Sequence, residues 1–89
     1  MATIVFTQQL ARFLPVPQLA TDATTLRSAL DNVFAANSRL RGYVLDDQDR
    51  LRDNVVIFID GRRTRERVRL DDPLRPDSTI HILQALSGG

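Results

Sequence analysis

The fold is decided by the stretch Val55-Val56-Ile57-Phe58-Ile59-Asp60-Gly61. Its first five residues are apolar, and β-branched and aromatic side chains of this kind favour a strand. Because the run is apolar without interruption, we expect a central strand with little solvent on either face. Asp60-Gly61 is a dipeptide typical of two-residue hairpin turns. The sequence therefore predicts that the chain turns back beside this strand.

The segment after the turn predicts a returning strand with two different faces. Alternation places Val68 and Leu70 on one face and Arg65, Arg67 and Arg69 on the other. We expect the two apolar residues to face the core.

Three further strands are predicted towards the ends of the chain. Residues 4–7 and 79–83 are rich in β-branched side chains. Residues 14–19 contain Pro15 and Pro17, so a strand there is expected at the edge of the sheet, because proline cannot donate to a ladder.

An amphipathic helix is predicted between the strand at residues 14–19 and the strand at residues 55–59. Candidate N-cap residues occupy positions 22–25, and Asn37 is a candidate left-handed residue at the end of the helix. Between them, apolar residues recur at helical spacing and form one stripe. The stripe consists of Leu26, Ala29, Leu30, Val33 and Phe34.

A mostly polar connection is predicted at residues 40–53, in which Tyr43-Val44-Leu45 is the only run of consecutive apolar residues. Four aspartates in this connection suggest a calcium loop, but the glycine and the final glutamate of the EF-hand spacing are missing. A solvated loop is therefore favoured over a metal site. The four aspartates are Asp46, Asp47, Asp49 and Asp53.

This order of elements predicts an α+β fold, a mixed sheet of four to five strands with one main helix across one face. Residues 1–86 are expected to form one domain, and residues 87–89 a flexible tail. The helix is expected to pack on the inward-facing residues of the strands. These are Ile4, Phe6, Val55, Ile57, Ile59, Val68, Ile80 and Ile82.

Composition excludes several classes of function. The 89 residues include no cysteine, so disulfides, thiolate metal sites and a cysteine nucleophile are absent, and a single histidine, His81, cannot form a histidine metal cluster. The net charge of +1 argues against nucleic-acid binding. No apolar run reaches the roughly 20 residues of a membrane span. With no secretory signal at the N-terminus, we expect a cytoplasmic protein.

All twelve basic residues are arginines. Five of them lie between Arg62 and Arg69. They form either a solvated strand face that discourages edge pairing or a docking patch for an acidic partner. Because lysine is absent, the chain cannot receive an isopeptide link on a lysine side chain.

The sequence ends in Ser87-Gly88-Gly89 directly after the last predicted strand. Together with the order of elements, this ending resembles the β-grasp, ubiquitin-like sulfur carriers of the MoaD/ThiS type. The resemblance covers almost the whole chain, but only the tail is a specific motif. It rests on the opening strand with Leu10 and Arg12, the helix stripe, residues 55–61 and residues 82–89.

Departures from the family pattern bear on the pathway. The family often has Asp-Gly-Asp where this chain has Arg75-Pro76-Asp77, and molybdopterin synthase subunits usually carry Pro-Pro where it has Gln84-Ala85. The loop at 46–52 looks closer to the carriers of cysteine synthesis (CysO-like). The small subunit of molybdopterin synthase, in molybdenum cofactor biosynthesis, is the next candidate, and the shorter thiamin carrier is third.

The resemblance implies a carrier and not an enzyme. A ubiquitin-activating-enzyme-like adenylyltransferase would use ATP and magnesium to adenylate Gly89, which sulfur then converts to a thiocarboxylate that serves a sulfur-accepting synthase. Gly88 and Ser87 would thread the narrow active sites, since glycine tolerates close backbone approach. The chain itself would bind no cofactor and no metal. The same activation also admits a ubiquitin-like modifier joined to targets through Gly89, and a plain binding module is a third alternative.

The outer face of the sheet is the candidate docking surface. His81 and Leu83 alternate with core residues, as do Val56 and Phe58, so all four are expected to point away from the helix. They form either scattered exposed residues or an apolar patch that docks the adenylating enzyme.

Overall fold

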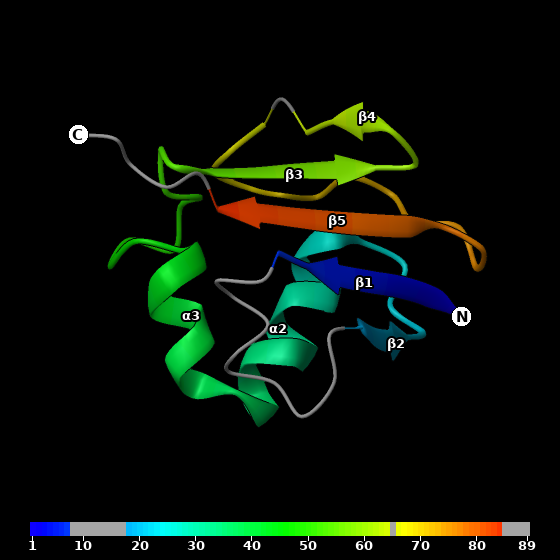
Figure 1. The fold of residues 1–89 in the computed structure, drawn as a ribbon, viewed down its shortest axis with the longest axis horizontal. Helices are drawn as coiled ribbons and strands as arrows, with labels where there is room; N and C mark the ends of the chain where they lie inside the picture. The colour runs from blue at the N-terminus through cyan, green and yellow to red at the C-terminus, as the bar shows by residue number, and fades with distance from the viewer. Residues whose placement is uncertain (8–17, 65, 85–89) are drawn as a thin grey trace.

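The computed structural model describes residues 1–7, 18–64 and 66–84 (Figure 1). Predictions on Leu10, Arg12, residues 14–17, Arg65 and residues 85–89 lie outside the described residues. The described elements are β1 (Ala2–Phe6), β2 (Gln18–Thr21), α2 (Leu26–Ala36), α3 (Ser38–Val44), β3 (Val55–Ile59), β4 (Arg62–Arg63) and β5 (Thr79–Gln84).

The strands form one mixed sheet in the order β2-β1-β5-β3-β4. β1 and β5 are parallel, and the other neighbours are antiparallel. The mixed sheet is confirmed, and β3 lies inside it between β5 and β4, with β5 at the centre. The expectation of little solvent on either face of β3 is wrong. The outward-facing Val56 and Phe58 of β3 are only half-buried. Its apolar run therefore reflects one core face and one exposed apolar face.

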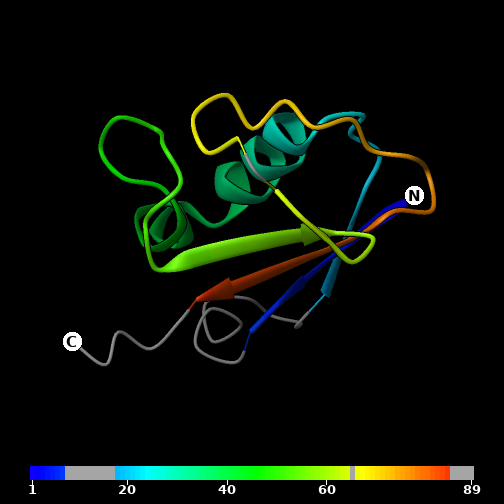
Figure 2. The same cartoon turned by 90° about the horizontal axis from the view of Figure 1, so that it is seen from above.

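Helix α2 lies across the inner face of the sheet, as predicted (Figure 2). Its N-cap is Thr25, whose side-chain oxygen accepts the Ser28 N–H over 3.2 Å. The predicted left-handed stop at Asn37 is wrong, because its φ is −139°. Asn37 instead ends the helix through its backbone N–H and its Nδ2, which both donate to the Val33 carbonyl oxygen over 3.0 Å. All five residues of the predicted stripe are buried.

Helix α3 replaces the first part of the predicted polar connection. Leu40 and Val44 are fully buried and lie one helical turn apart, and Leu45 follows them into the core. The helix has only seven residues and contains Gly42, a poor helix former, so its short apolar pattern was not distinctive. The fold therefore has two described helices in place of one.

The returning strand is much shorter than predicted. The turn at Asp60-Gly61 is confirmed, with φ of 50° and 83° at the two residues, values that glycine and aspartate tolerate in hairpins. β4 ends after Arg63, and residues 67–69 form bends. Val68 is 55% exposed, so its predicted place in the core is wrong, whereas Leu70 is fully buried.

The core lies between the inner face of the sheet and the two helices. Apart from Val68 and the partly buried Ile59, the predicted inward-facing residues are buried there. They are Ile4, Phe6, Val55, Ile57, Ile80 and Ile82.

The aspartate-rich loop is held by its own hydrogen bonds. One carboxylate oxygen of Asp46 accepts the backbone N–H groups of Gln48 and Arg50 over 2.9 and 3.0 Å. Over the described ranges no cluster of three or more histidine or carboxylate side chains is placed to hold a metal ion. In the same part of the chain, no helix is long and apolar enough to cross a membrane.

Candidate functional site

The outer face of the sheet brings together the four predicted docking residues. Ladder register places Val56 opposite Leu83 and Phe58 opposite His81. Val5 of β1 lies on the other side of His81, a neighbour that the sequence analysis missed because parallel β1–β5 pairing was not predicted. We call these five residues the outer-face patch.

The outer-face patch is accessible in the described structure. Leu83 is 37% exposed and His81 is exposed, while the other three side chains are half-buried. Both helices lie on the opposite side of the sheet (Figure 2). An apolar surface of this kind, carried on a rigid sheet, suits a protein-binding site.

A row of paired residues crosses the whole sheet through the patch. Gln18 pairs with Val5, Val5 with His81, His81 with Phe58, and Phe58 with Arg63. The row has a polar residue at each end, and Val5 and Phe58 flank His81 in its middle. Apolar side chains inside a polar rim are typical of protein interfaces.

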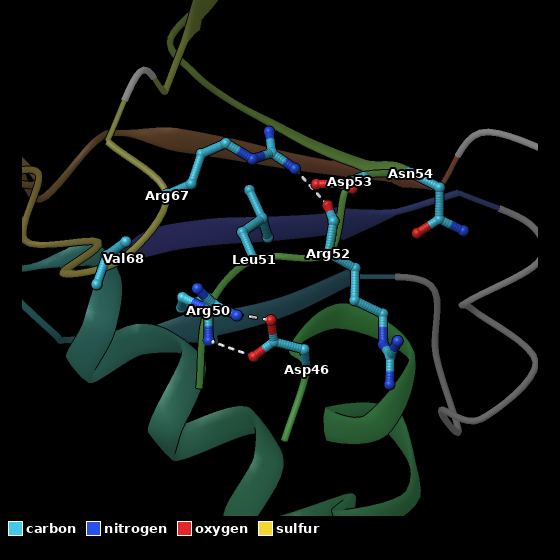
Figure 3. Close-up of a pocket in the computed structure, with 8 residues that line it drawn as sticks. All are labelled: Asp46, Arg50, Leu51, Arg52, Asp53, Asn54, Arg67 and Val68. Carbon is cyan, nitrogen blue, oxygen red and sulfur yellow. Dashed lines mark hydrogen bonds and ion pairs between the residues drawn. The ribbon is translucent and has the colours of Figure 1, made fainter. Parts of the chain in front are cut away.

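A second surface is an open hollow of about 610 Å³ beside the start of β3 (Figure 3). Its arginines are engaged with the protein itself. Arg50 Nε donates to Asp46 Oδ2 over 3.3 Å, and Arg52 Nε donates to the Gly42 carbonyl oxygen over 2.7 Å. The hollow is lined by Asp46, Arg50, Leu51, Arg52, Asp53, Asn54, Arg67 and Val68.

The predicted arginine patch divides into two kinds of residue. Arg62, Arg63 and Arg69 are exposed, as a docking patch or a solvated face requires. Arg67 is half-buried, and its guanidinium donates to the carbonyl oxygens of Arg52 and Val55. Arg67 therefore has a structural role, which alternation along a strand did not indicate.

Glu66 shapes the turn that follows β4. Its carboxylate accepts the backbone N–H groups of Val68 and Arg69 over 2.7 and 2.6 Å. These hydrogen bonds, with that from Val68 the largest effect, lower the pKa of Glu66 below its ordinary value. The charged form of Glu66 is thus part of the folded turn.

The predicted sulfur-bearing residues Gly89, Gly88 and Ser87 lie outside the described residues. The strand that leads to them is firmly placed, because β5 lies between β1 and β3. Its last residue, Gln84, pairs with Val55, and its N–H donates to Thr7 Oγ1 over 3.4 Å. Five residues follow Gln84, and fully extended they span about 17 Å.

No family model matches the chain, and no curated protein matches it. Solved structures do. SAMP1 from Haloferax volcanii, a small archaeal modifier protein, is 20% identical with a TM-score of 0.84 over 99% of this chain and 98% of that chain. A chain of the Amycolatopsis orientalis BexX/CysO complex is 14% identical, with a TM-score of 0.84 over 100% of both chains. A putative molybdopterin converting factor, subunit 1, from Pyrococcus furiosus is 13% identical, with a TM-score of 0.68 over 96% of this chain and 97% of that chain.

These similarities define the class of fold. The chain has the ubiquitin-like β-grasp fold of the small carrier and modifier proteins. The predicted resemblance to the MoaD/ThiS type is confirmed by these neighbours at the level of the fold.

Proposed function

We propose that this chain is a small ubiquitin-like sulfur carrier whose Gly89 is adenylated by a partner enzyme and converted to a thiocarboxylate. The observation that carries the proposal is the placement of β5. The strand lies at the centre of a β-grasp sheet and leads within five residues to Gly88-Gly89. A central strand gives the following residues a rigid base from which to enter a partner's active site.

The chemistry follows from the poor reactivity of a carboxylate. The Gly89 carboxylate attacks the α-phosphate of ATP, held with Mg²⁺ by the partner, and forms an acyl-adenylate with loss of pyrophosphate. Sulfide sulfur then displaces AMP and leaves a thiocarboxylate, a good sulfur nucleophile. A chain without cysteine carries no side-chain thiol to compete for the activated carbonyl.

The outer-face patch supports docking of that adenylyltransferase and of a sulfur-accepting synthase. Its apolar side chains supply binding energy, while exposed arginines at the β4 edge, Arg62 and Arg63, supply long-range steering. A cysteine-type pathway is favoured, because the loop at 46–52 looks closer to the CysO-like carriers and a CysO complex is among the neighbours.

Two observations favour alternative functions of the same terminus. The SAMP1 neighbour is named as a modifier, which supports conjugation to other proteins through Gly89. The Pyrococcus furiosus neighbour is named as a molybdopterin converting factor subunit, which supports the small subunit of molybdopterin synthase.

Intact-mass measurement tests the carrier proposal. The full chain is incubated with ATP, Mg²⁺, sulfide and a cognate adenylyltransferase, and we expect one oxygen to be replaced by sulfur. Gly88→Val is the matched variant, and it should fold normally but remain unmodified. An unchanged wild-type mass beside an active enzyme would refute the proposal. Covalent adducts with target proteins, found without thiocarboxylate, would establish the modifier instead.

A further inference from the structure

The ladder between β3 and β4 stops one rung short of the start of β3. Ile59 pairs with Arg62, and the Thr64 N–H donates to the Ile57 carbonyl oxygen over 2.8 Å. In an antiparallel ladder, every second residue bonds to the same neighbouring strand. The next rung would therefore join Val55 to Glu66.

Glu66 does not supply that rung, because its carboxylate binds the N–H groups of Val68 and Arg69 and turns the chain away. Arg67 fills the place instead. Its Nη2 donates to the Val55 carbonyl oxygen over 2.9 Å and also to the carbonyl oxygen of Arg52. The Val55 N–H donates to that same Arg52 oxygen over 3.0 Å. One guanidinium thus completes the outer edge of β3.

We call the Arg67 guanidinium with its two carbonyl acceptors, on Val55 and Arg52, the Arg67 clamp. The clamp lies beside the residues that hold the end of β5. Successive residues of a strand direct their backbone N–H and C=O groups to opposite sides. The backbone groups of Val55 therefore point towards β4 and those of Val56 towards β5, where the partner of Val56 is Leu83. Val56 and Leu83 therefore form the last hydrogen-bonded rung before Gln84, the partner of Val55. Loss of the clamp removes the Arg67 hydrogen bond that holds Val55, the residue next to the Val56–Leu83 rung.

We propose that Arg67 is a positioning residue for the C-terminal end of β5. By replacing the missing rung of β4 it holds the first residue of β3 in place, and through the Val56–Leu83 rung it fixes the position of Gln84, the last residue of β5. The consequence of this Arg67 role for adenylation rests on the proposed function, whereas the effect of Arg67 on the sheet does not.

Amide hydrogen exchange of the full chain tests the effect on the sheet. Arg67→Met keeps the aliphatic stem and removes the donors, and Arg69→Met is the matched control on an exposed side chain of the same turn. We expect the Val56 and Leu83 amides to exchange roughly tenfold faster in Arg67→Met, the order of effect expected when the charge-assisted hydrogen bond to the adjacent residue, Val55, is lost. The Phe58 and His81 amides and the control variant should keep wild-type rates. Unchanged exchange at Val56 and Leu83 would overturn the proposal.

The kinetics of adenylation test the consequence for the tail. With the adenylyltransferase, Arg67→Met should lower kcat and leave KM unchanged, because the outer-face patch is intact. Faster exchange with wild-type kcat would overturn the positioning role. If wild-type chain is not adenylated at all, the proposed function fails, but the exchange comparison still decides the clamp. Should Arg67→Met fail to fold, Arg67→Lys takes its place with the same expected direction, since the lysine Nζ ends one bond short of the Nη2 that reaches both carbonyl oxygens.

Discussion

Arg27 in helix α2 binds the backbone of Val68, with 2.7 Å between Arg27 Nη2 and the Val68 carbonyl oxygen. The same guanidinium donates to the carbonyl oxygens of Arg69 and Asp49 over 3.2 and 3.0 Å. One side chain therefore joins a helix to two loops that are far apart in sequence. Residues 46–50 and 66–70, which form these loops, lie outside the described strands.

Replacing Arg27 with methionine should destabilise the protein by about 1–3 kcal/mol, because three carbonyl groups lose a charged donor. The lower part of this range is expected, since these bonds lie near solvent. The midpoint of urea denaturation measures the effect, with Arg39→Met in helix α3 as the control for an exposed arginine. Equal midpoints for the two variants would contradict the role assigned to Arg27.

The two glycines of the described chain predict opposite effects of alanine. Gly61 has a φ of 83°, which an alanine adopts only with strain, so Gly61→Ala should cost about 1–2 kcal/mol. Gly42 lies inside α3, and an added Cβ there meets no atom within 4 Å. Gly42→Ala should therefore stabilise the protein by about 0.5–1 kcal/mol.

Thermal melting of the two alanine variants, each against wild type, checks this pair. A higher Tm for Gly61→Ala, or a lower one for Gly42→Ala, would show that the turn or the second helix is placed wrongly.

Sequence patterns that are long or chemically specific predicted their elements correctly. The stripe from Leu26 to Phe34 predicted α2, and Asp60-Gly61 predicted the hairpin, because only certain residues accept positive φ at both turn positions. The outer-face residues of β3 and β5 were also found, since strict alternation along two adjacent strands determines which side chains share a face.

The incorrect predictions, of the connection at residues 40–53 and of the returning strand, share one physical cause. In both segments, contacts between residues distant in sequence determine the structure. α3 is too short to be stable by itself, and burial of Leu40 and Val44 selects it. Residues 66–69 alternate like a strand, but side chains take the place of ladder hydrogen bonds here. The carboxylate of Glu66 and the guanidiniums of Arg67 and Arg27 bind backbone groups instead. No local pattern records such side-chain bonds.

The carboxylates that organise turns predict a loss of stability in acid. Backbone hydrogen bonds lower the pKa of Glu66 below the ordinary glutamate value of 4.5. They also lower the pKa values of Asp46 and Asp60 below the ordinary aspartate value of 3.8. A group with a lowered folded-state pKa stabilises the folded state above its ordinary pKa, and this contribution is lost as the pH falls through the folded value. Stability should therefore decline as the pH falls below about 4.5, where the unfolded chain begins to bind more protons.

Urea midpoints measured from neutral pH into this acid range test the prediction. Glu66→Gln should be less stable than wild type at neutral pH and should lose less stability in acid. Asp31→Asn, an exposed carboxylate of α2, is the control for charge removal. An identical acid profile for Glu66→Gln and wild type would contradict the assigned role of the Glu66 carboxylate.

The last prediction distinguishes the two candidate docking surfaces. Phe58 is the largest apolar residue of the outer-face patch and lies between His81 and Arg63 in the ladder. Large side chains that become buried in an interface carry most of its binding energy, whereas charges at the rim mainly set the association rate. Phe58→Ala should therefore weaken binding to the adenylyltransferase by more than about 1 kcal/mol.

Arg63→Ala is the matched comparison, because Arg63 is exposed and pairs directly with Phe58 across β3 and β4. It should slow association and flatten its dependence on salt, with a smaller loss of affinity. Titration calorimetry gives the affinities, and stopped-flow association at two salt concentrations gives the rates. Arg67 is unsuitable for this comparison, because its guanidinium holds the start of β3. Wild-type affinity for Phe58→Ala, together with a large loss for Arg63→Ala, would place the docking site on the β4 edge instead of the outer face.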